Sequence, residues 1–146
     1  MSTETDRSPA NAAPGGAQVY KARTVRKIDP VSAAIAEALK GVAPLRYVKL
    51  FPGRLTASNA ISTEGRKNPV VTLGAEGIVG VELLVDAESR VVQFFTITSA
   101  VKGCGRKMVA AVVSATPADW HLAVVMDWSG GFWRRMAEQY PRLVIF

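Results

Sequence analysis

The spacing of apolar positions predicts a helix in the first third of the chain. One apolar stripe has the three- and four-residue spacing of a helix face, and it comprises Val31, Ala34, Ile35, Ala38 and Leu39. Asp29 can cap a helix that starts at Pro30, since its carboxylate accepts from free backbone N–H groups. Gly41 can adopt the left-handed backbone conformation, with positive φ, that often ends a helix. These signals predict a helix over residues 30–40.

Strand signals dominate the middle of the chain. Residues 70–73, 78–85 and 90–99 are rich in β-branched and aromatic side chains and are separated by turn residues. They predict a meander of two or three antiparallel strands. Residues 45–51 fit either a strand or a helical turn, and the loose alternation over residues 18–28 predicts a short strand.

The last third predicts two helices and two strands. Residues 106–115 and 132–139 have helical spacing, whereas residues 120–126 and 143–146 indicate strands. The Gly-, Ser-, Asn- and Pro-rich stretch 52–69 predicts a long loop. Together these elements indicate an α+β fold with a mixed, mostly antiparallel sheet flanked by helices.

Composition divides the chain into a tail and one domain. Residues 1–17 consist mainly of Ser, Thr, Ala, Pro and Gly without an apolar period, which predicts a disordered tail before a domain over residues 18–146. The apolar runs 108–113 and 122–126 are far shorter than the roughly 20 residues that span a bilayer, so we expect no membrane span. The first residues also lack a secretory signal pattern.

The cysteine and histidine content limits the disulfides and metal sites that the chain can form. One Cys and one His can form neither an intramolecular disulfide nor the usual zinc site. We therefore expect no metal and a reducing, cytoplasmic location.

The net charge of +6 is unevenly distributed. Residues 1–28 carry five basic and two acidic groups, and residues 101–146 carry six basic and three acidic groups. Such an excess suits phosphate-bearing ligands, nucleic acid or an acidic protein surface, or serves only solubility. A protein or nucleic-acid partner is therefore a hypothesis for the basic N-terminal arm.

The junction between the strand 90–99 and the next helix combines glycines with positive charge. Gly103 and Gly105 let the backbone approach a ligand closely. Lys102, Arg106 and Lys107 add positive charge where the free N–H groups of the helix start. This combination predicts a cradle for phosphate or pyrophosphate, and an ordinary strand-to-helix turn is the alternative.

Two common nucleotide motifs do not fit this junction. Met108 stands where the dinucleotide fingerprint needs Gly or Ala. Arg106 follows Gly105 where the P-loop needs Lys.

From about residue 78 to the end, the chain resembles the GNAT family of N-acetyltransferases. In that family a meander ends in a strand and a loop of the form Gln/Arg-x-x-Gly-x-Gly/Ala, to which Ala100-Val101-Lys102-Gly103-Cys104-Gly105 is similar. The later strand, the polar residue Asp127, the helix containing Trp133 and the last strand follow the family's order.

The resemblance implies an acyl-CoA-binding protein that transfers an acyl group from acetyl-CoA to an amine. It implies that the strand end at Thr98 pairs with the pantetheine arm, and that Glu82 acts as the catalytic base. The implied cofactor-binding residues are Thr98, Ala100, Lys102, Gly103, Cys104, Gly105, Arg106, Lys107 and Asp127.

The chain departs from the family at two positions. Ala100 replaces Gln or Arg, and Trp133 stands where the family often has a tyrosine acid, although an indole N–H is no useful proton donor. The alternative is a non-catalytic protein of the same fold with a structural or assembly role in an oligomer, such as a phage virion protein. A third interpretation, a nucleic-acid-binding module, is based on charge alone.

Overall fold

The computed structural model describes residues 16–124 and 131–146. Its elements are β1 (Gln18–Lys21), α1 (Pro30–Lys40), β2 (Tyr47–Phe51), β3 (Arg54–Ser58), β4 (Val79–Asp86), β5 (Val91–Ser99), α2 (Cys104–Ala115), β6 (His121–Val124), α3 (Phe132–Gln139) and β7 (Leu143–Ile145). The α+β class is confirmed.

The seven strands form one mixed sheet in the order β1-β2-β3-β4-β5-β6-β7. Three neighbouring pairs, from β2 to β5, are antiparallel, whereas β1–β2, β5–β6 and β6–β7 are parallel. The three antiparallel pairs are the longer ones, so most of the paired residues are in antiparallel register. The parallel pairs arise where a helix connects two strands, because the chain then returns to the same end of the sheet before it pairs again.

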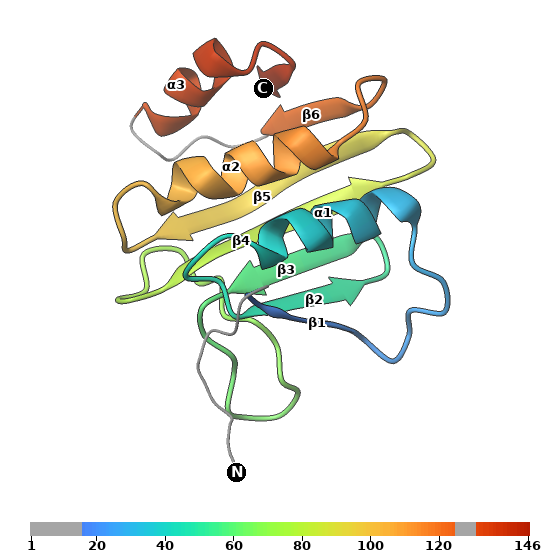
Figure 1. Ribbon diagram of the computed structural model, residues 1–146, viewed down its shortest axis with the longest axis vertical. Helices are drawn as coiled ribbons and strands as arrows, with labels where there is room; N and C mark the ends of the chain where they lie inside the picture. Colours follow the sequence, from blue (N-terminus) through green and yellow to red (C-terminus); the bar gives the residue numbers. More distant parts are fainter. Residues whose placement is uncertain (1–15, 125–130) are drawn as a thin grey trace.

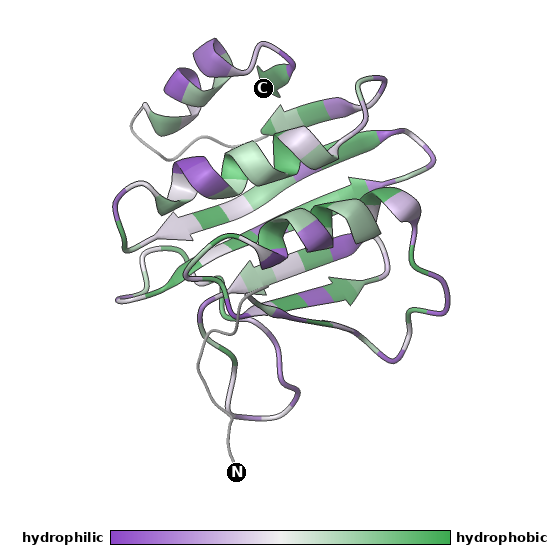
Figure 2. Cartoon of the chain, viewed as in Figure 1, coloured by the Kyte–Doolittle hydropathy of each residue, from purple (hydrophilic) through white to green (hydrophobic). Residues whose placement is uncertain are grey.

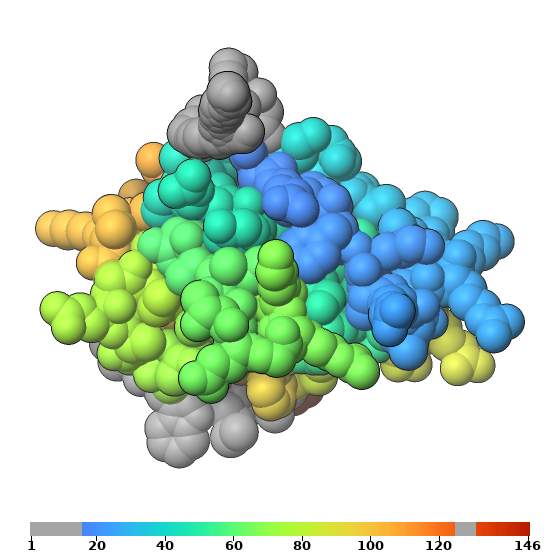
Figure 3. Space-filling view, turned by 90° about the horizontal axis from the view of Figure 1, so that it is seen from below, coloured from blue at the N-terminus to red at the C-terminus, as the bar shows by residue number. Residues whose placement is uncertain are grey.

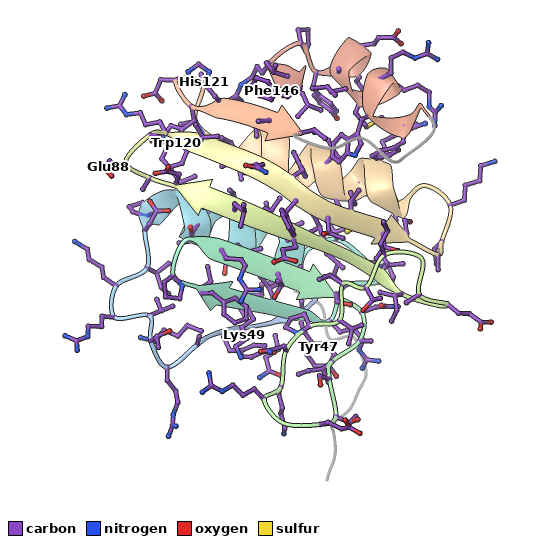
Figure 4. The ribbon with its side chains drawn as sticks, turned by 180° about the vertical axis from the view of Figure 1, so that it is seen from behind. Tyr47, Lys49, Glu88, Trp120, His121 and Phe146 are labelled. Atoms are coloured by element: carbon purple, nitrogen blue, oxygen red, sulfur yellow. The ribbon has the colours of Figure 1, made fainter. Side chains whose placement is uncertain are left out.

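The core lies between the sheet and the two longer helices. Figure 1 shows α1 and α2 lying side by side across one face of the sheet, and Figure 4 shows the opposite face without a helix in front of it. The fully buried side chains between these layers include Ile35, Leu39, Val48, Leu55, Val81, Leu83, Met108 and Val109. Burial of each such side chain contributes about 1.5–3 kcal/mol of hydrophobic free energy.

The predicted start of α1 is confirmed. The Asp29 carboxylate accepts from the N–H groups of Val31 (3.3 Å) and Ser32 (2.9 Å), and Pro30 is the first helical residue. The predicted left-handed ending is wrong, because Gly41 has φ −86°. The Gly41 N–H instead donates to Ala38 O at 3.3 Å, which tightens the last turn.

The long loop predicted over residues 52–69 is also wrong. It contains β3, which pairs with β2 across the turn at Gly53 (φ +67°) and with β4 on its other side. The strand predicted over residues 70–73 does not form, and Ile61 and Pro69 make only an isolated bridge nearby.

Gly16 and Ala17 belong to the packed structure. Ala17 is 6% exposed, and its N–H donates to Lys40 O at 3.0 Å. The rest of the predicted tail, residues 1–15, lies outside the described residues.

Arg142 holds the connection between α2 and β6. Its guanidinium donates to Thr116 O (3.1 Å) and Trp120 O (3.1 Å), and also to Val113 O (3.4 Å) and Pro117 O. One side chain thereby satisfies the carbonyls at the end of the helix and in the following turn.

Replacement of Arg142 is predicted to destabilise the fold. Arg142→Ala leaves these part-buried carbonyls without their charged donor, so the free energy of unfolding is expected to fall by about 2 kcal/mol or more. Urea unfolding measures this change. Arg23→Ala, at an exposed position, is the control and is expected to change stability by less than about 0.5 kcal/mol. Equal stabilities of the two variants would contradict the assignment.

Candidate functional site

The site expected at the end of β5 begins with an irregularity in the strand. Glu82 pairs with Thr96 while Leu83 pairs with Phe94, so Phe95 is an extra residue that has no partner on β4. Such a bulge bends the strand and increases its twist. The Phe95 side chain is 55% exposed.

Beyond this bulge, β4 is the one neighbour of β5 among the described residues. The pairing of β5 with β4 continues to Ser99, and its described pairing with β6 covers Val91 to Phe94. The last two positions of the strand predicted over residues 120–126 lie outside the described residues. On the β6 side, residues 96–99 therefore present backbone N–H and C=O groups that no strand within residues 16–124 and 131–146 pairs.

The unpaired edge leads directly into the loop before α2 (Figure 1). Gly103 caps the helix with φ +91°, and a Cβ added there would meet no atom within 4 Å. The loop is closed by its own hydrogen bonds: the Ala100 N–H donates to Ile78 O (3.0 Å) and the Cys104 N–H to Val101 O (3.2 Å). No side chain caps the helix. The Lys107 N–H donates to Gly103 O at 3.3 Å, which leaves the N–H groups of Gly105 and Arg106 without an acceptor among the described residues.

The charge around this helix end is positive. Lys102, Arg106 and Lys107 are exposed, and the first turn of α2 has no acidic residue. Figure 2 shows hydrophilic residues on this turn beside the apolar body of the helix. Since the helix dipole favours negative charge at this end, basic side chains there favour an anion from outside the chain.

The start of α3 lies beside the start of α2. A Cβ added at Gly105 would lie 3.3 Å from the Phe132 ring, so glycine permits this close contact. The first turn of α3 also lacks acidic residues, and Arg134 and Arg135 on it are exposed. Two helix N-termini with basic first turns thus occur at one end of the molecule.

The structure brings together part of the predicted cofactor site. Lys102, Gly103, Arg106 and Lys107 share the exposed end of α2 with Ala100, whose N–H is already used. Asp127 lies outside the described residues.

Three predicted cofactor contacts are buried instead. The Cys104 thiol points inward, 3.9 Å from Ala43 O, and Gly105 lies beneath Phe132. Thr98 is 7% exposed, and its hydroxyl accepts from the Gly74 N–H at 3.3 Å. Thr98 and Gly105 are therefore limited to backbone contacts with a ligand, and the thiol does not line the loop surface.

Glu82 is not part of the loop site. It lies on the helix-free face of β4, and its side chain is 14% exposed. One carboxylate oxygen, Oε2, accepts from Arg54 Nη1 at 3.1 Å. The sequence analysis missed Arg54 because that residue falls within the predicted loop.

Trp133 belongs to the core. It is 4% exposed, and its ring centroid lies 4.9 Å from that of Phe94 and 5.1 Å from that of Phe132. The position where the family often has a proton donor is therefore used for packing.

The described ranges, 16–124 and 131–146, contain no group of three or more His, Cys, Asp or Glu side chains that could hold a metal ion. No helix in these ranges is long and apolar enough to cross a membrane. Comparisons with models of protein families, with curated proteins and with solved structures find no match to this chain.

Replacement of Gly105 by a larger residue is predicted to destabilise the fold, because Gly105 contacts Phe132. Gly105→Val places side-chain atoms where the Phe132 ring lies, and overpacking of this kind costs about 1–3 kcal/mol. Thermal unfolding is expected to show this loss. In a Phe132→Ala background the same substitution is expected to cost much less, because the opposing ring is gone. An equal cost in both backgrounds would show that the two residues are not in contact.

Proposed function

We propose that the protein binds acyl-CoA, with acetyl-CoA as the simplest case, and transfers the acyl group to an amine. One observation carries the proposal: residues 96–99, whose β6-side edge no described strand pairs, lead directly into a basic helix N-terminus at Lys102–Lys107. This arrangement suits a ligand that has amide groups along one part and phosphates along the next. The resemblance to the GNAT family supports the same ligand.

The chain contributes backbone and charge to this binding. The free N–H and C=O groups of residues 96–99 can pair with the amides of a pantetheine arm, as an added strand does. The α2 N-terminus, with Lys102, Arg106 and Lys107, can hold the pyrophosphate. When bound, an acyl-CoA supplies an activated thioester, and the chain's task is to orient it.

Glu82 is the proposed base for the accepting amine. Its pairing with Thr96 places it beside the bulge that follows the last described pair of β5 with β6. The Oε1 atom has no hydrogen-bond partner among the described residues, since Arg54 contacts Oε2. A carboxylate so held could take a proton from the ammonium group of the acceptor, which would leave a neutral amine as the nucleophile toward the thioester that a bound acyl-CoA would supply.

The second candidate is a CoA-binding or structural protein of this fold without catalysis. Burial of Trp133 in the core and the ion pair between Glu82 and Arg54 favour it, because they leave no evident acid and engage the base. In this case the basic arm and the pair Arg134-Arg135 would contact a protein or nucleic-acid partner, as in a virion assembly.

Neutralising the helix end is predicted to weaken CoA binding. The triple variant Lys102→Gln, Arg106→Gln, Lys107→Gln removes three charges near the proposed pyrophosphate position, and the Kd for CoA is expected to rise at least about tenfold at low salt. The difference is expected to shrink at high salt. Calorimetric titration with CoA measures both.

The matched control replaces exposed charges elsewhere. Arg23→Gln with Arg26→Gln, in the connection between β1 and α1, is expected to leave the Kd nearly unchanged. Absence of CoA binding by the wild-type protein at millimolar ligand would refute the proposal.

Glu82→Gln separates the two candidates. For an enzyme, loss of a positioned base is expected to reduce acyl transfer to amines about 100-fold while CoA binding persists. Glu88→Gln, at an exposed turn position, is the control and is expected to retain full turnover. Turnover retained in full by Glu82→Gln would exclude Glu82 as the base. Wild-type protein that binds CoA but transfers no acyl group to a panel of amines would support the second candidate.

A further inference from the structure

The helix-free face of the sheet has a row of polar side chains that the acyl-CoA proposal leaves largely unexplained. In the strand register, Lys49, Thr56, Glu82 and Thr96 are neighbours on β2, β3, β4 and β5. The residues that alternate with them, such as Leu55, belong to the helix-covered core. Lys49 is only 7% exposed and Thr56 only 3%, so the row is buried although no helix covers it.

A pocket lies over part of this row. It has a volume of about 450 Å³ and lies between β2, β3 and the segment 59–78. Its lining includes Phe51, Arg54 and Thr56 from the strands, and Asn68, Val70 and Val71 from the segment. Figure 3 shows the segment in green beside the blue residues of β1, and Figure 4 shows Lys49 on this face. The volume falls within the range of small-molecule sites.

Hydrogen bonds hold the segment in place over the sheet. Lys49 Nζ lies 2.6 Å from Asn68 Oδ1, and the Tyr20 hydroxyl donates to Lys67 O at 2.8 Å. Burial, and to a smaller extent Tyr47, raises the pKa of Tyr20 above its ordinary value. The pocket wall is thus built from fixed contacts.

Arg54 is the charged residue that lines the pocket, and Lys49 lies close by, beside the lining residue Asn68. Lys49 and Arg54 both lie over the Phe51 ring, with Nζ at 5.0 Å and Cζ at 3.9 Å from its centroid. Glu82 is the one carboxylate paired with them among the described residues, and it contacts Arg54 through Nη1. The other N–H groups of the guanidinium have no partner there, so the cluster retains a net positive charge and unused donors.

Thr56 supplies an independent sign of a missing partner. Its hydroxyl Oγ1 is buried and makes no hydrogen bond within the described part of the chain. An unpaired buried hydroxyl costs about 1–3 kcal/mol, and a ligand atom that pairs with it removes this cost.

We propose that this pocket binds a small organic carboxylate with an apolar body. The carboxylate would accept from the free N–H groups of Arg54 and from the Thr56 hydroxyl, while Phe51, Val70 and Val71 pack against the apolar part. This inference does not depend on the acyl-CoA proposal.

NMR titration of the full chain with butanoate, hexanoate and 3-phenylpropanoate tests the proposal. The matched amides of these three acids are the neutral controls. At least one carboxylate is expected to bind at least about tenfold more tightly than its amide, since charge-assisted hydrogen bonds are the stronger ones. The largest shifts are expected at Thr56 and Val70. If no carboxylate binds more tightly than its amide, the proposal is overturned.

Substitution of Thr56 provides the second test. Thr56→Val has nearly the same shape but no hydroxyl, so the free protein is expected to be as stable as wild type or more stable. Its carboxylate affinity is expected to fall about fivefold, corresponding to one lost hydrogen bond. Thr56→Ser retains a hydroxyl and is expected to retain binding. Unchanged affinity in Thr56→Val would overturn the role of the hydroxyl.

A charge variant keeps the proposal testable if Thr56→Val fails to fold. Arg54→Gln combined with Glu82→Gln removes the ion pair without leaving either charge unpaired, and it is expected to abolish the preference for carboxylate over amide. Arg23→Gln with Arg26→Gln removes two exposed charges distant in sequence from the pocket and is expected to keep that preference. A preference retained by the Arg54/Glu82 variant would overturn the proposal.

Discussion

The unequal pairing of the two edges of β5 determines how the site end of the molecule is built. Along one edge, β4 pairs with the strand from Val91 to Ser99, and along the other edge the described part of β6 pairs with Val91 to Phe94. The extra residue Phe95 directly follows this last described pair. A bulge bends a strand and increases its local twist. Among the described residues, β4 is therefore the one neighbour of residues 96–99.

The helix ends depend on the same geometry. The chain leaves β5 at the unpaired end, and α2 therefore starts there, with Gly103 as its cap. Gly105 then lets the Phe132 ring approach the first turn of α2, which brings the start of α3 to the same place. Both first turns have basic and no acidic residues. Because glycine has no side chain, Gly105 allows two helix N-termini and their basic residues to lie together at one end of the molecule.

Local chemistry explains which features the sequence predicts well. The Asp29–Pro30 cap and the helix over residues 132–139 depend on side chains close together in the chain, and both are confirmed. The exposed cations at Lys102 and Lys107 were predicted for the same reason. β3 was missed because the stretch 52–69 as a whole is rich in Gly, Ser, Asn and Pro, which favours a loop. Within it, Arg54, Thr56 and Ser58 alternate with the apolar Leu55 and Ala57, a short strand pattern that could have found β3.

Long-range contacts explain the remaining errors. The direction of the Cys104 thiol is set by packing near Ala43, sixty-one residues away in the chain. The ion pair of Glu82 depends on Arg54, twenty-eight residues before it. Burial of Trp133 depends on Phe94 in another element. No local pattern contains these pairs, so the sequence could predict the loop of the candidate site but not the surroundings of its proposed base.

Amide hydrogen exchange with and without acetyl-CoA tests the central claim most directly, because it reports on the backbone groups to which the claim assigns binding. The account predicts that acetyl-CoA slows exchange at the amides of residues 96–99 and at the first turn of α2, and has little effect on β1 and the connection to α1. Unchanged exchange at residues 96–107 under conditions where acetyl-CoA is bound would contradict the account.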